Sequence, residues 1–497
     1  MDDLLDRSAM ALAGMIRRRE VSPVELLEAH IAQIEAVNPA LNAVIATRYE
    51  AARAEARVAE QRVMAAAEPQ ALPSLLGLPY TTKEYIMAEG MPLTAGVWSR
   101  RHVRADRDAT TVRRLREAGA ILVGITNVPE GGLWLETYND VYGRTVNPWS
   151  LEHTSGGSSG GEGAIVATAG VAFGLGADVG GSIRIPAAFC GTVGHKPTGR
   201  LVPNTGFWPP AGDGNLSGYL VCGPLTRKVE DVMPILRALA GPDGHDVVVE
   251  PWSLGDPAEV ELRDVTVYPV QSSGLVRVSE ENRRAVHDAA AALRARGARV
   301  ELLDAPRMKK AFPIWAAMMA TGGGPHYADV LGDGAPISPA RELVRLALGR
   351  SHHTLPALVI AGLEELMARV PSRVDAAVAE GHALRAELEE VLGPRGVLLH
   401  PPYSRPAPRH YRPMLTPFDF VCTGLFNVLE LPSTVVPTGF SREGLPLAVQ
   451  VIGRRGHDHL TVAVAAALEE DFGGWRRARP CWRVPERFVG PDSLISS

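Results

Sequence analysis

The sequence predicts an α/β protein whose mixed, largely parallel central β-sheet is covered by helices on both faces. Three observations predict this class. Helical and strand-like stretches alternate along the chain, one stretch has the pattern of a βαβ unit, and no repeat or low-complexity linker divides the 497 residues. We therefore expect one domain over residues 1–497, with a mainly helical insertion or cover at about 309–390 that is rich in Ala, Leu and Met.

Apolar periodicity and capping signals place the individual elements. Ser22-Pro23-Val24-Glu25 is a capping box with proline at the first helical position, so a helix begins there. The βαβ unit lies within residues 264–303. The predicted helices cover residues 22–37, 110–118, 279–296 and 458–471, and the predicted strands cover residues 120–125, 264–270, 298–303 and 447–452.

Composition and charge exclude several classes of protein. The formal net charge is -5 and Arg is spread along the chain, so we expect no nucleic-acid partner. The four cysteines, Cys190, Cys222, Cys422 and Cys481, form no CxxC pair and predict neither a disulfide framework nor a zinc knuckle. The start is unlike a secretory signal, and no apolar run reaches about 18 residues. We expect a cytoplasmic protein without a membrane span; surface contact through a short amphipathic helix stays open.

Two serines lie in glycine-rich backbone. Ser158 belongs to SGGSSGGEG at residues 155–163, and Ser182 belongs to DVGGSIR at residues 178–184. Such glycine density is typical of left-handed or strained backbone and of close approach by a ligand. Apolar stretches on both sides of residues 155–163 favour a buried position over a flexible linker. A phosphate-binding loop would end in Gly-Lys-Ser/Thr, and this segment does not.

One interpretation makes Ser158 the nucleophile. Residues 156–160 match G-x-S-x-G, the nucleophile elbow of α/β-hydrolases, which lies between a strand and a helix. The preceding NPWSLEHTSGG does not have the pattern of a strand. An elbow also needs a later acid and a histidine, and none of His400, His410, His457 and His459 has a recognisable setting. An esterase of this type is kept as an alternative.

A second interpretation comes from resemblance. GGSSGG at residues 156–161, Ser182 placed 24 residues after Ser158, and Lys83 within GLPYTTKE at residues 77–84 together resemble the amidase signature family. Similar flanking pieces extend the likeness over most of the chain. They lie at residues 38–43, 194–198 and 444–451. Further stretches are most similar to the fatty-acid amide hydrolase 2 branch of this family: residues 133–136, 142–144, 417–432 and 457–475.

The resemblance implies a Ser-cisSer-Lys triad. Ser182 is then the nucleophile, Ser158 relays protons from a cis peptide after Gly157, and Lys83 is the base. A lysine acts as a base only when neutral, and burial lowers its pKa from about 10.4. Lys83 follows the apolar run 75–80, as expected for the end of a buried strand. The relay also returns a proton to the leaving amine, which departs poorly as an anion.

The residues around Ser182 suggest how charge is stabilised. Val179, Gly180, Gly181 and Ser182 offer successive backbone N–H groups for an oxyanion hole at a strand-to-helix junction. We expect Asp178 and Arg184 to order this loop as supporting charges. Substrate binding is expected at Gly131, Gly132, Leu133 and Trp134, together with the helical residues Trp315, Met318 and Met319.

The sequence therefore predicts an amidase that cleaves neutral or hydrophobic amides, such as an aryl acylamide, a fatty amide or a carbamate (urethane), through an acyl-enzyme. Neither His352-His353 nor His457-x-His459 has a carboxylate at ligand spacing, so we expect no metal and no cofactor. The partner is a small-molecule substrate, and a homodimer is one open assembly. A glutamine-amidotransferase A-type subunit, which shares this site but works in a complex, is the alternative of a different class.

Overall fold

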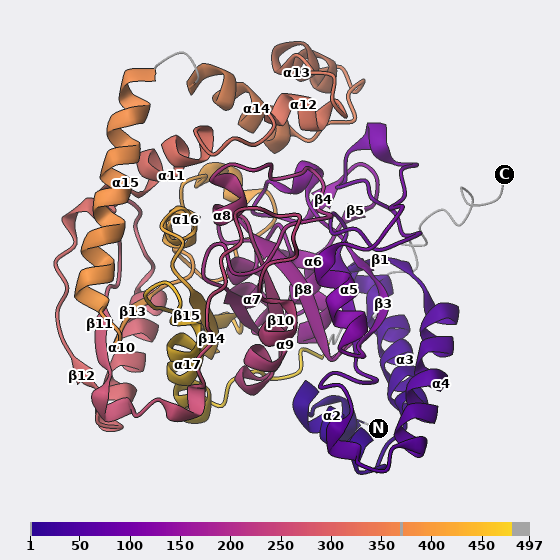
Figure 1. Cartoon of the computed structure of the whole chain (residues 1–497). Helices are drawn as coiled ribbons and strands as arrows, with labels where there is room; N and C mark the ends of the chain where they lie inside the picture. Colours follow the sequence, from indigo (N-terminus) through magenta and orange to yellow (C-terminus); the bar gives the residue numbers. More distant parts are fainter. Residues whose placement is uncertain (1, 368–370, 480–497) are drawn as a thin grey trace.

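A computed structural model describes residues 2–367 and 371–479 and has the predicted α/β architecture. Eleven strands form one central sheet (Figure 1). In spatial order they are β1 (Val44–Thr47), β3 (Ile121–Thr126), β2 (Pro79–Lys83), β8 (Phe173–Asp178), β10 (Val221–Thr226), β9 (Val193–Lys196), β14 (Ser433–Phe440), β15 (Pro446–Ile452), β13 (Gly396–His400), β11 (Thr266–Pro269) and β12 (Arg299–Val300).

The sheet is mixed, with a smaller parallel share than expected. β2 runs parallel to β3 and β8, and β11 runs parallel to β12 and β13. The other six neighbouring pairs are antiparallel. Buried strands have the same apolar pattern in either direction, so the connection between two strands decides whether they run parallel or antiparallel. The short turn at residues 441–445 forces β14 and β15 into an antiparallel hairpin.

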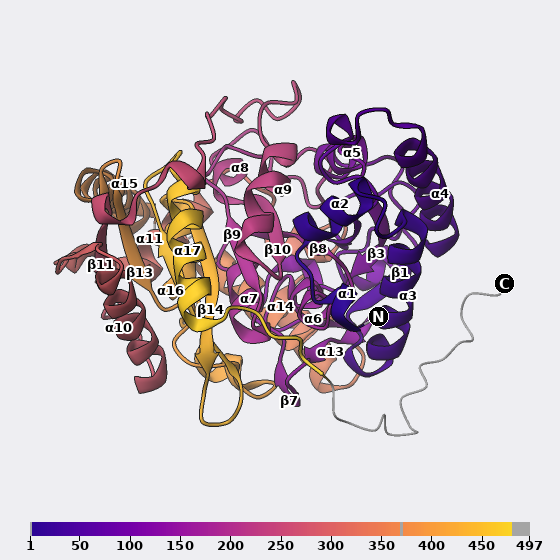
Figure 2. The same cartoon turned by 90° about the horizontal axis from the view of Figure 1, so that it is seen from below.

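Helices cover both faces of the sheet. Alternate strand residues point to opposite faces, as Val435 and Val436 do by joining different apolar clusters. One face carries α2 (Ala9–Arg17), α5 (Thr110–Glu117), α9 (Val232–Leu239), α10 (Glu280–Ala295) and α17 (Asp458–Phe472), several of which cross the view in Figure 2. The other carries mainly α3 (Pro23–Leu41), α4 (Tyr49–Ala65), α6 (Gly160–Ala167), α7 (Arg184–Cys190), α11 (Ala311–Ala320), α15 (Pro371–Leu392) and α16 (Val421–Val428).

The stretch expected as a helical cover is built from helices. Between α11 and α15 lie α12 (Tyr327–Leu331), α13 (Pro339–Ala347) and α14 (Leu355–Met367), which gather at the top of Figure 1. α12 packs against residues 130–132, where the substrate loop was expected. The remaining short elements are α1 (Asp2–Leu5), α8 (Leu216–Tyr219), and two hairpins made of β4 (Tyr138–Asn139) with β5 (Gly143–Arg144) and β6 (Val146–Asn147) with β7 (Ser150–Thr154).

Most element predictions are confirmed, with small shifts at the ends. The Ser22 capping box starts α3, which continues to Leu41 past the expected end at Val37. The βαβ unit is present as β11, α10 and β12, although β12 has only two residues. One expectation is wrong: part of the segment before Ser158 does form a strand, β7, whose partner β6 lies outside the central sheet. Only two residues separate β7 from its hairpin partner β6, which supplied pairing that periodicity did not reveal.

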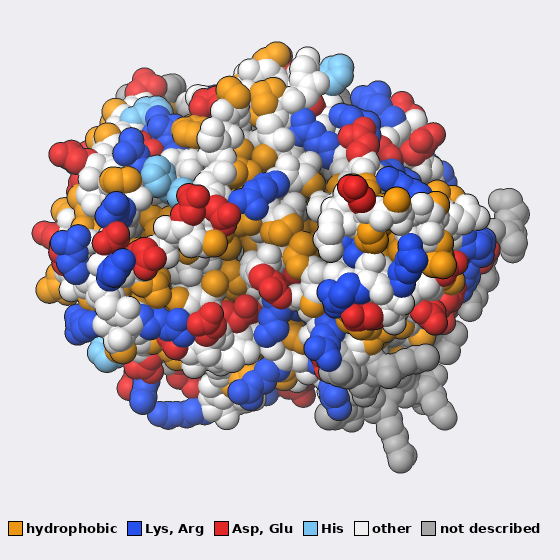
Figure 3. Space-filling view, turned by 60° about the horizontal axis from the view of Figure 1, so that its bottom comes forward, with side chains coloured by type: hydrophobic (Ala, Val, Ile, Leu, Met, Phe, Trp, Pro, Cys, Tyr) orange, Lys and Arg blue, Asp and Glu red, His pale blue; other side chains and the backbone are white. Residues whose placement is uncertain are grey.

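The surface and the cysteines add two points. On the face in Figure 3, acidic and basic side chains are interspersed, in keeping with the modest net charge. Cys190, Cys222 and Cys422 are free thiols in the interior, and Cys481 lies outside the described residues.

Among the described residues, no helix is long and apolar enough to cross a membrane.

Candidate active site

The candidate site forms where neighbouring parallel strands end. Lys83 is the last residue of β2, and Asp178 is the last residue of β8, which pairs with β2 in parallel. The carboxyl ends of parallel strands meet at one edge of a sheet, where α/β proteins commonly bind ligands. The glycine-rich segments that carry Ser158 and Ser182 lie at this edge. The fold thus brings together three residues that are up to 99 positions apart in sequence.

Lys83 and Ser158 form a hydrogen-bonded pair in the interior. The Lys83 Nζ lies 2.7 Å from the Ser158 Oγ and 3.3 Å from the carbonyl oxygen of Ala177. Lys83 is fully buried, and only 1% of Ser158 is exposed. The Tyr85 ring centroid lies 4.3 Å from the ammonium nitrogen. A lysine in this setting is removed from bulk water and directed at a hydroxyl group.

Burial changes the protonation of Lys83. Loss of hydration lowers the pKa of Lys83 to about 7, and the opposing attraction of the Asp178 carboxylate is weaker. A substantial fraction of this amine is therefore neutral near pH 7 and can accept a proton. Glu162, on α6, is a second buried titratable group near the lysine; burial raises its pKa to about 8, while it accepts hydrogen bonds from Thr81 and Thr126.

The Ser158 segment is close to both other parts of the site. The Gly157–Ser158 peptide bond is cis, as the family resemblance implies. The next amide, that of Ser159, donates to the backbone carbonyl of Ser182 at 3.1 Å. On the opposite side, a Cβ on Gly157 would collide with the backbone carbonyl of Trp134. The Ser158 segment is thus packed between the Ser182 segment and the expected substrate loop.

Ser182 differs from Ser158 in its exposure. It lies between the end of β8 and the start of α7 at Arg184, which is the predicted strand-to-helix junction. Ser182 and Gly180 are half-buried, whereas Ser158 and Lys83 are fully enclosed. Of the two serines, Ser182 is therefore the one that a molecule arriving from solvent can reach.

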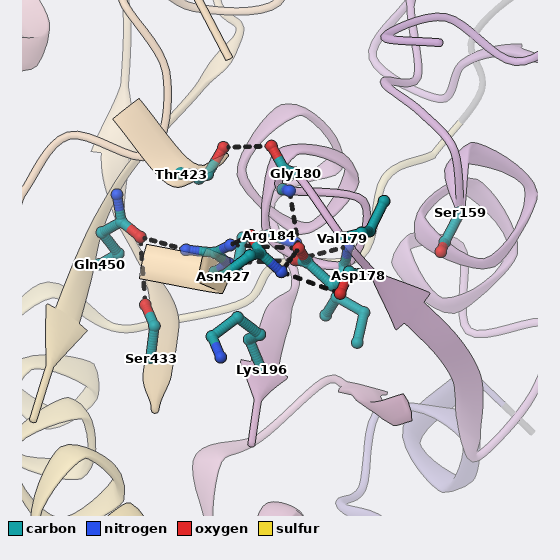
Figure 4. A network of polar contacts seen from close by, with 12 residues as sticks. Ser159, Asp178, Val179, Gly180, Arg184, Lys196, Thr423, Asn427, Ser433 and Gln450 are labelled. Carbon is teal, nitrogen blue, oxygen red and sulfur yellow. Dashed lines mark hydrogen bonds and ion pairs between the residues drawn. The ribbon is translucent and has the colours of Figure 1, made fainter. Parts of the chain in front are cut away.

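Asp178 and Arg184 order the Ser182 loop, as expected. The Asp178 carboxylate accepts from the amides of Gly181 (2.6 Å) and Ile183 (3.0 Å) and pairs with the guanidinium of Arg184, Nε at 3.0 Å. Burial alone would raise the pKa of Asp178, but the charge and hydrogen bonds of Arg184, with Asn427 and the amides, lower it well below the usual range. The loop is thus bent around a charged carboxylate (Figure 4).

Two residues distant in sequence complete this network. Arg184 donates to the Oδ1 of Asn427 at 2.6 Å and to the Oε1 of Gln450 at 3.1 Å. Asn427 lies on α16 and Gln450 on β15, so the nucleophile loop is joined to the far half of the sheet (Figure 4). Sequence reasoning missed both; the only available signal was a polar residue within an apolar helix and within an apolar strand.

The four amides expected to form an oxyanion hole differ in their hydrogen bonds and in their exposure. The Gly181 N–H donates to Asp178, so this amide supports the loop. The Gly180 and Ser182 amides belong to the two half-buried residues of the segment, and the Val179 amide precedes them. Gly181 has a φ of +121°, a conformation that L residues rarely adopt, and a side chain there would collide with Thr423.

The expected substrate residues lie beside the catalytic pair. Gly131 and Gly132 have positive φ values of 61° and 72°, and a Cβ on them would meet the rings of Tyr327 and Tyr85 respectively. Tyr85 is the ring next to Lys83. Leu133 and Trp134 are partly buried, with Leu133 packed against the α12 and α14 cluster.

The helical residues expected near the substrate divide into two groups. Trp315 donates its Nε1–H to the carbonyl of Val179 at 3.2 Å, and its ring packs edge-on against Phe420, with centroids 4.6 Å apart. Met318 and Met319, both on α11, pack in the apolar cluster that α11 forms with α15 and α16. Trp315 therefore borders the Ser182 loop, and the methionines belong to the core. Phe420 is a further residue at the loop that sequence reasoning missed.

The histidines proposed for an elbow mechanism have other contacts. His400 is buried, with its Nδ1 at 2.8 Å from the carbonyl of Pro401. His410 contacts Leu151 and Arg144, and His457 contacts the carbonyl of Arg455. The hydroxyl of Ser158 is instead bonded to a lysine.

The fold and the buried lysine–serine pair define an enzyme of the amidase class, and the comparisons with known proteins agree. The family model described as Amidase matches residues 25–462. The chain therefore belongs to the amidase family, whose members hydrolyse carbon–nitrogen bonds other than peptide bonds.

Individual relatives are similar to this chain over nearly its whole length. The chain is 38% identical to fatty-acid amide hydrolase 2 of Homo sapiens over 492 residues, which covers 95% of this chain and 90% of that protein. Its structure is similar to 6-aminohexanoate cyclic dimer hydrolase complexed with substrate, at a TM-score of 0.80, 28% identity and coverage of 96% and 99%. It is also similar to a bacterial aryl acylamidase, at a TM-score of 0.78, 27% identity and coverage of 95% and 96%.

Proposed function

We propose that this enzyme hydrolyses amides of neutral or hydrophobic carboxylic acids, with Ser182 as nucleophile, Ser158 as proton relay and Lys83 as base. The observation that carries the proposal is the buried 2.7 Å contact between Lys83 Nζ and Ser158 Oγ. It joins a base whose pKa is lowered to about 7 to the hydroxyl group of a residue adjacent to Ser159, whose amide bonds the carbonyl of the half-buried Ser182. Such a base accepts a proton near neutral pH.

The proton and electron movements follow from this order. Neutral Lys83 takes the hydroxyl proton of Ser158, which takes that of Ser182 as the Ser182 oxygen attacks the amide carbonyl. When the tetrahedral intermediate collapses, Ser158 protonates the leaving nitrogen and Lys83 returns a proton to Ser158. The C–N bond breaks and an acyl-Ser182 ester is left. Water then attacks this ester by the same path and releases the acid.

The oxyanion of the tetrahedral intermediate needs donors that are fixed in advance. We assign this role to the amides of Val179, Gly180 and Ser182, because the Gly181 amide is already bonded to Asp178. Each donor of this kind is worth about 2.7–4 kcal/mol of transition-state stabilisation. The Asp178–Arg184 pair keeps the loop in shape without contacting the substrate.

Apolar residues near the loop favour a hydrophobic acyl or aryl group. The backbone of Trp134 borders Gly157, Leu133 packs against the α12 and α14 cluster, and Trp315 and Phe420 pack beside Gly180. The names of the relatives, fatty-acid amide hydrolase 2, 6-aminohexanoate cyclic dimer hydrolase and aryl acylamidase, all fit this class. Carbamates and esters pass through the same tetrahedral geometry, so a urethane belongs in the test panel.

Labelling with a fluorophosphonate probe tests the assignment. We expect the purified protein to be labelled on Ser182, identified by peptide mapping, and the labelling rate to fall sharply in Lys83→Ala. Labelling on Ser158 that is unaffected by Lys83→Ala would instead support the elbow mechanism and exclude the proposed triad.

A substrate panel separates the remaining alternative. The isolated chain should hydrolyse anilides, fatty amides or carbamates without another subunit. Release of ammonia from glutamine only when partner subunits are added, with no hydrolysis of the panel by the chain alone, would instead identify an amidotransferase A-type subunit.

A further inference from the structure

Three successive backbone carbonyls before Ser182 each accept a side-chain hydrogen bond from the distant half of the chain. Asn427 Nδ2 donates to the carbonyl of Asp178 at 2.9 Å. Trp315 Nε1 donates to the carbonyl of Val179 at 3.2 Å. The single hydroxyl proton of Thr423 is shared between the carbonyl of Gly180, with Oγ1 at 2.9 Å, and that of Phe420, with Oγ1 at 2.8 Å; the contact with Gly180 is drawn in Figure 4. We call Trp315, Thr423 and Asn427 the carbonyl clamp.

The three side chains come from two packed helices. Thr423 and Asn427 are one turn apart on α16 and so share a face, and Trp315 lies on α11, which packs against α16. Phe420, one turn before Thr423, is the ring nearest to Gly180 and packs on Trp315. One surface of the α11–α16 pair therefore meets the nucleophile loop at consecutive peptides.

Holding these carbonyls also directs the amides of the same peptides. The three peptide bonds are trans, so each N–H points opposite to its C=O. The clamped carbonyls of Asp178, Val179 and Gly180 belong to the peptides whose amides are those of Val179, Gly180 and Gly181. The clamp thus fixes the direction of these amides, and the Gly181 amide is directed at the carboxylate of Asp178.

The sequence makes such support necessary. The peptide between Gly180 and Gly181 has no side chain on either side, so its plane can rotate with little steric cost. Rotation would swing the Gly180 carbonyl dipole toward the reacting centre and point its negative end at a developing negative charge. Thr423 opposes this rotation directly, because its hydroxyl group bonds that carbonyl and also packs against Gly181.

We propose that Trp315, Thr423 and Asn427 are positioning residues of the oxyanion hole. Asn427 and Trp315 aim the amides of Val179 and Gly180 by holding the opposite carbonyls, and Thr423 keeps the Gly180 carbonyl turned away from the reacting centre. This inference rests on the proposed amidase function and on Ser182 as nucleophile. Its functional consequence is specific: the clamp stabilises the transition state, in which the oxyanion is formed, more than the bound substrate.

The test removes one hydroxyl group and keeps the shape. Thr423→Val deletes the donor to Gly180, and Thr423→Ser restores it. Thr168→Val is the matched control, since Thr168 is also a buried threonine whose hydroxyl group donates to carbonyls, those of Ala164 and Ile165, away from the loop. For each protein we would measure kcat and KM on an anilide, the inhibition constant of a trifluoromethyl ketone, and thermal unfolding.

We expect Thr423→Val to lower kcat about 10- to 100-fold and to weaken the ketone, which binds as a tetrahedral oxyanion, by a similar factor, with KM changed less than about threefold. Thr423→Ser and Thr168→Val should stay within about threefold of the wild type. Trp315→Phe, which keeps a ring and removes the donor to Val179, should show the same pattern and serves if Thr423→Val does not fold.

The outcomes separate the clamp from the chemistry. Unchanged kcat and ketone binding in both donor-deletion variants, with a wild type that is labelled on Ser182, would overturn the clamp and leave the proposed function intact. Equal losses in Thr168→Val and Thr423→Val would likewise overturn it, since any buried hydroxyl group would then matter. A wild type that neither hydrolyses amides nor labels on Ser182 would overturn both.

Discussion

The two serine regions are positioned in different ways. Ser158 is enclosed, and the contacts of its segment come from the first half of the chain: the Lys83 side chain bonds Ser158, and Gly157 packs against the backbone of Trp134. Ser182 is half-buried on a loop held by Arg184 nearby and by side chains more than 130 residues away, such as Trp315 and Asn427. The Ser158 segment is thus held within the first half of the chain, whereas the Ser182 loop is held by both halves.

This difference matches the proposed roles of the two serines. In the proposed mechanism Ser158 exchanges protons with Lys83, Ser182 and the leaving nitrogen of a bound substrate, so an enclosed position that keeps these groups within short range serves it. A nucleophile has to meet a substrate from solvent while the amides around it stay rigid, and rigidity at an exposed loop requires support from behind. The charged pair of Asp178 and Arg184, both fully buried, supplies part of that support.

The largest effects should come from deleting the serines themselves. We expect Ser182→Ala to lower kcat by about 10⁴-fold or more and to abolish fluorophosphonate labelling, because the covalent path is lost. Ser158→Ala should lower kcat by about 10²- to 10⁴-fold and slow the labelling, because Ser182 persists without its proton acceptor. Rapid labelling of Ser182→Ala on Ser158 would reverse the two roles.

The second effect is the pH dependence of the Lys83 base. Since burial lowers the pKa of Lys83 to about 7, kcat/KM should rise with pH through about 7 and then level off. At pH 5.5 it should be about 30-fold below the plateau, since the lysine is then mostly protonated.

The rate of fluorophosphonate labelling of Ser182 gives an independent readout of the same group. In the wild type the labelling rate should rise with pH through about 7, as kcat/KM does. The residual labelling of Lys83→Ala should not show this rise. A profile that is flat between pH 5.5 and 8 would exclude Lys83 as the titrating base.

Replacing the buried residues Arg184 and Lys83 should change the free energy of unfolding in opposite directions. Arg184→Leu leaves the carboxylate of Asp178 buried and unpaired, so we expect the free energy of unfolding to fall by about 3–5 kcal/mol. Lys83→Met should raise it at pH 7 by on the order of 1–4 kcal/mol. The folded-state pKa of Lys83 is below its unfolded value, so at pH 7 the unfolded chain binds the proton more tightly.

Urea unfolding at pH 7 measures both changes. The Lys83→Met gain should shrink as pH rises from about 7 toward about 10.4, where the amine is neutral in both states. Adding Asp178→Asn to Arg184→Leu removes the unpaired charge and should recover part of the loss. A destabilised Lys83→Met would show that the lysine is better solvated than its burial indicates.

The sequence predicted the local part of this arrangement better than the distant part. Glycine density located the two serine segments, and the resemblance of short local motifs to the amidase signature added Lys83 and the pairing of the two serines; the fold brings these three residues to one edge of the sheet. Strand direction was less predictable: buried strands have the same apolar pattern whichever way they run, and the sheet has more antiparallel pairs than expected.

The supports of the Ser182 loop could not be predicted in the same way. Thr423, Asn427 and Gln450 are single polar residues in apolar elements, and nothing in their neighbourhood along the chain indicates which group they contact. Their partners depend on how α16 and β15 pack against the loop, which is a property of the tertiary structure. The hydrogen bond from the Gly181 amide to Asp178, three residues away, is a local contact that was also not predicted.

The smallest expected effect concerns the substrate side of Ser158. If residues 131–134 border the acyl group, Leu133→Ala should raise KM about 3- to 10-fold for a long-chain anilide and leave acetanilide unchanged, because only the long chain contacts the lost methyl groups. Leu348→Ala, at an exposed position on the cover, is the control. Equal changes for both substrates would mean that Leu133 only packs against α12 and α14. Acyl selectivity would then depend on the Trp315 and Phe420 side of the Ser182 loop.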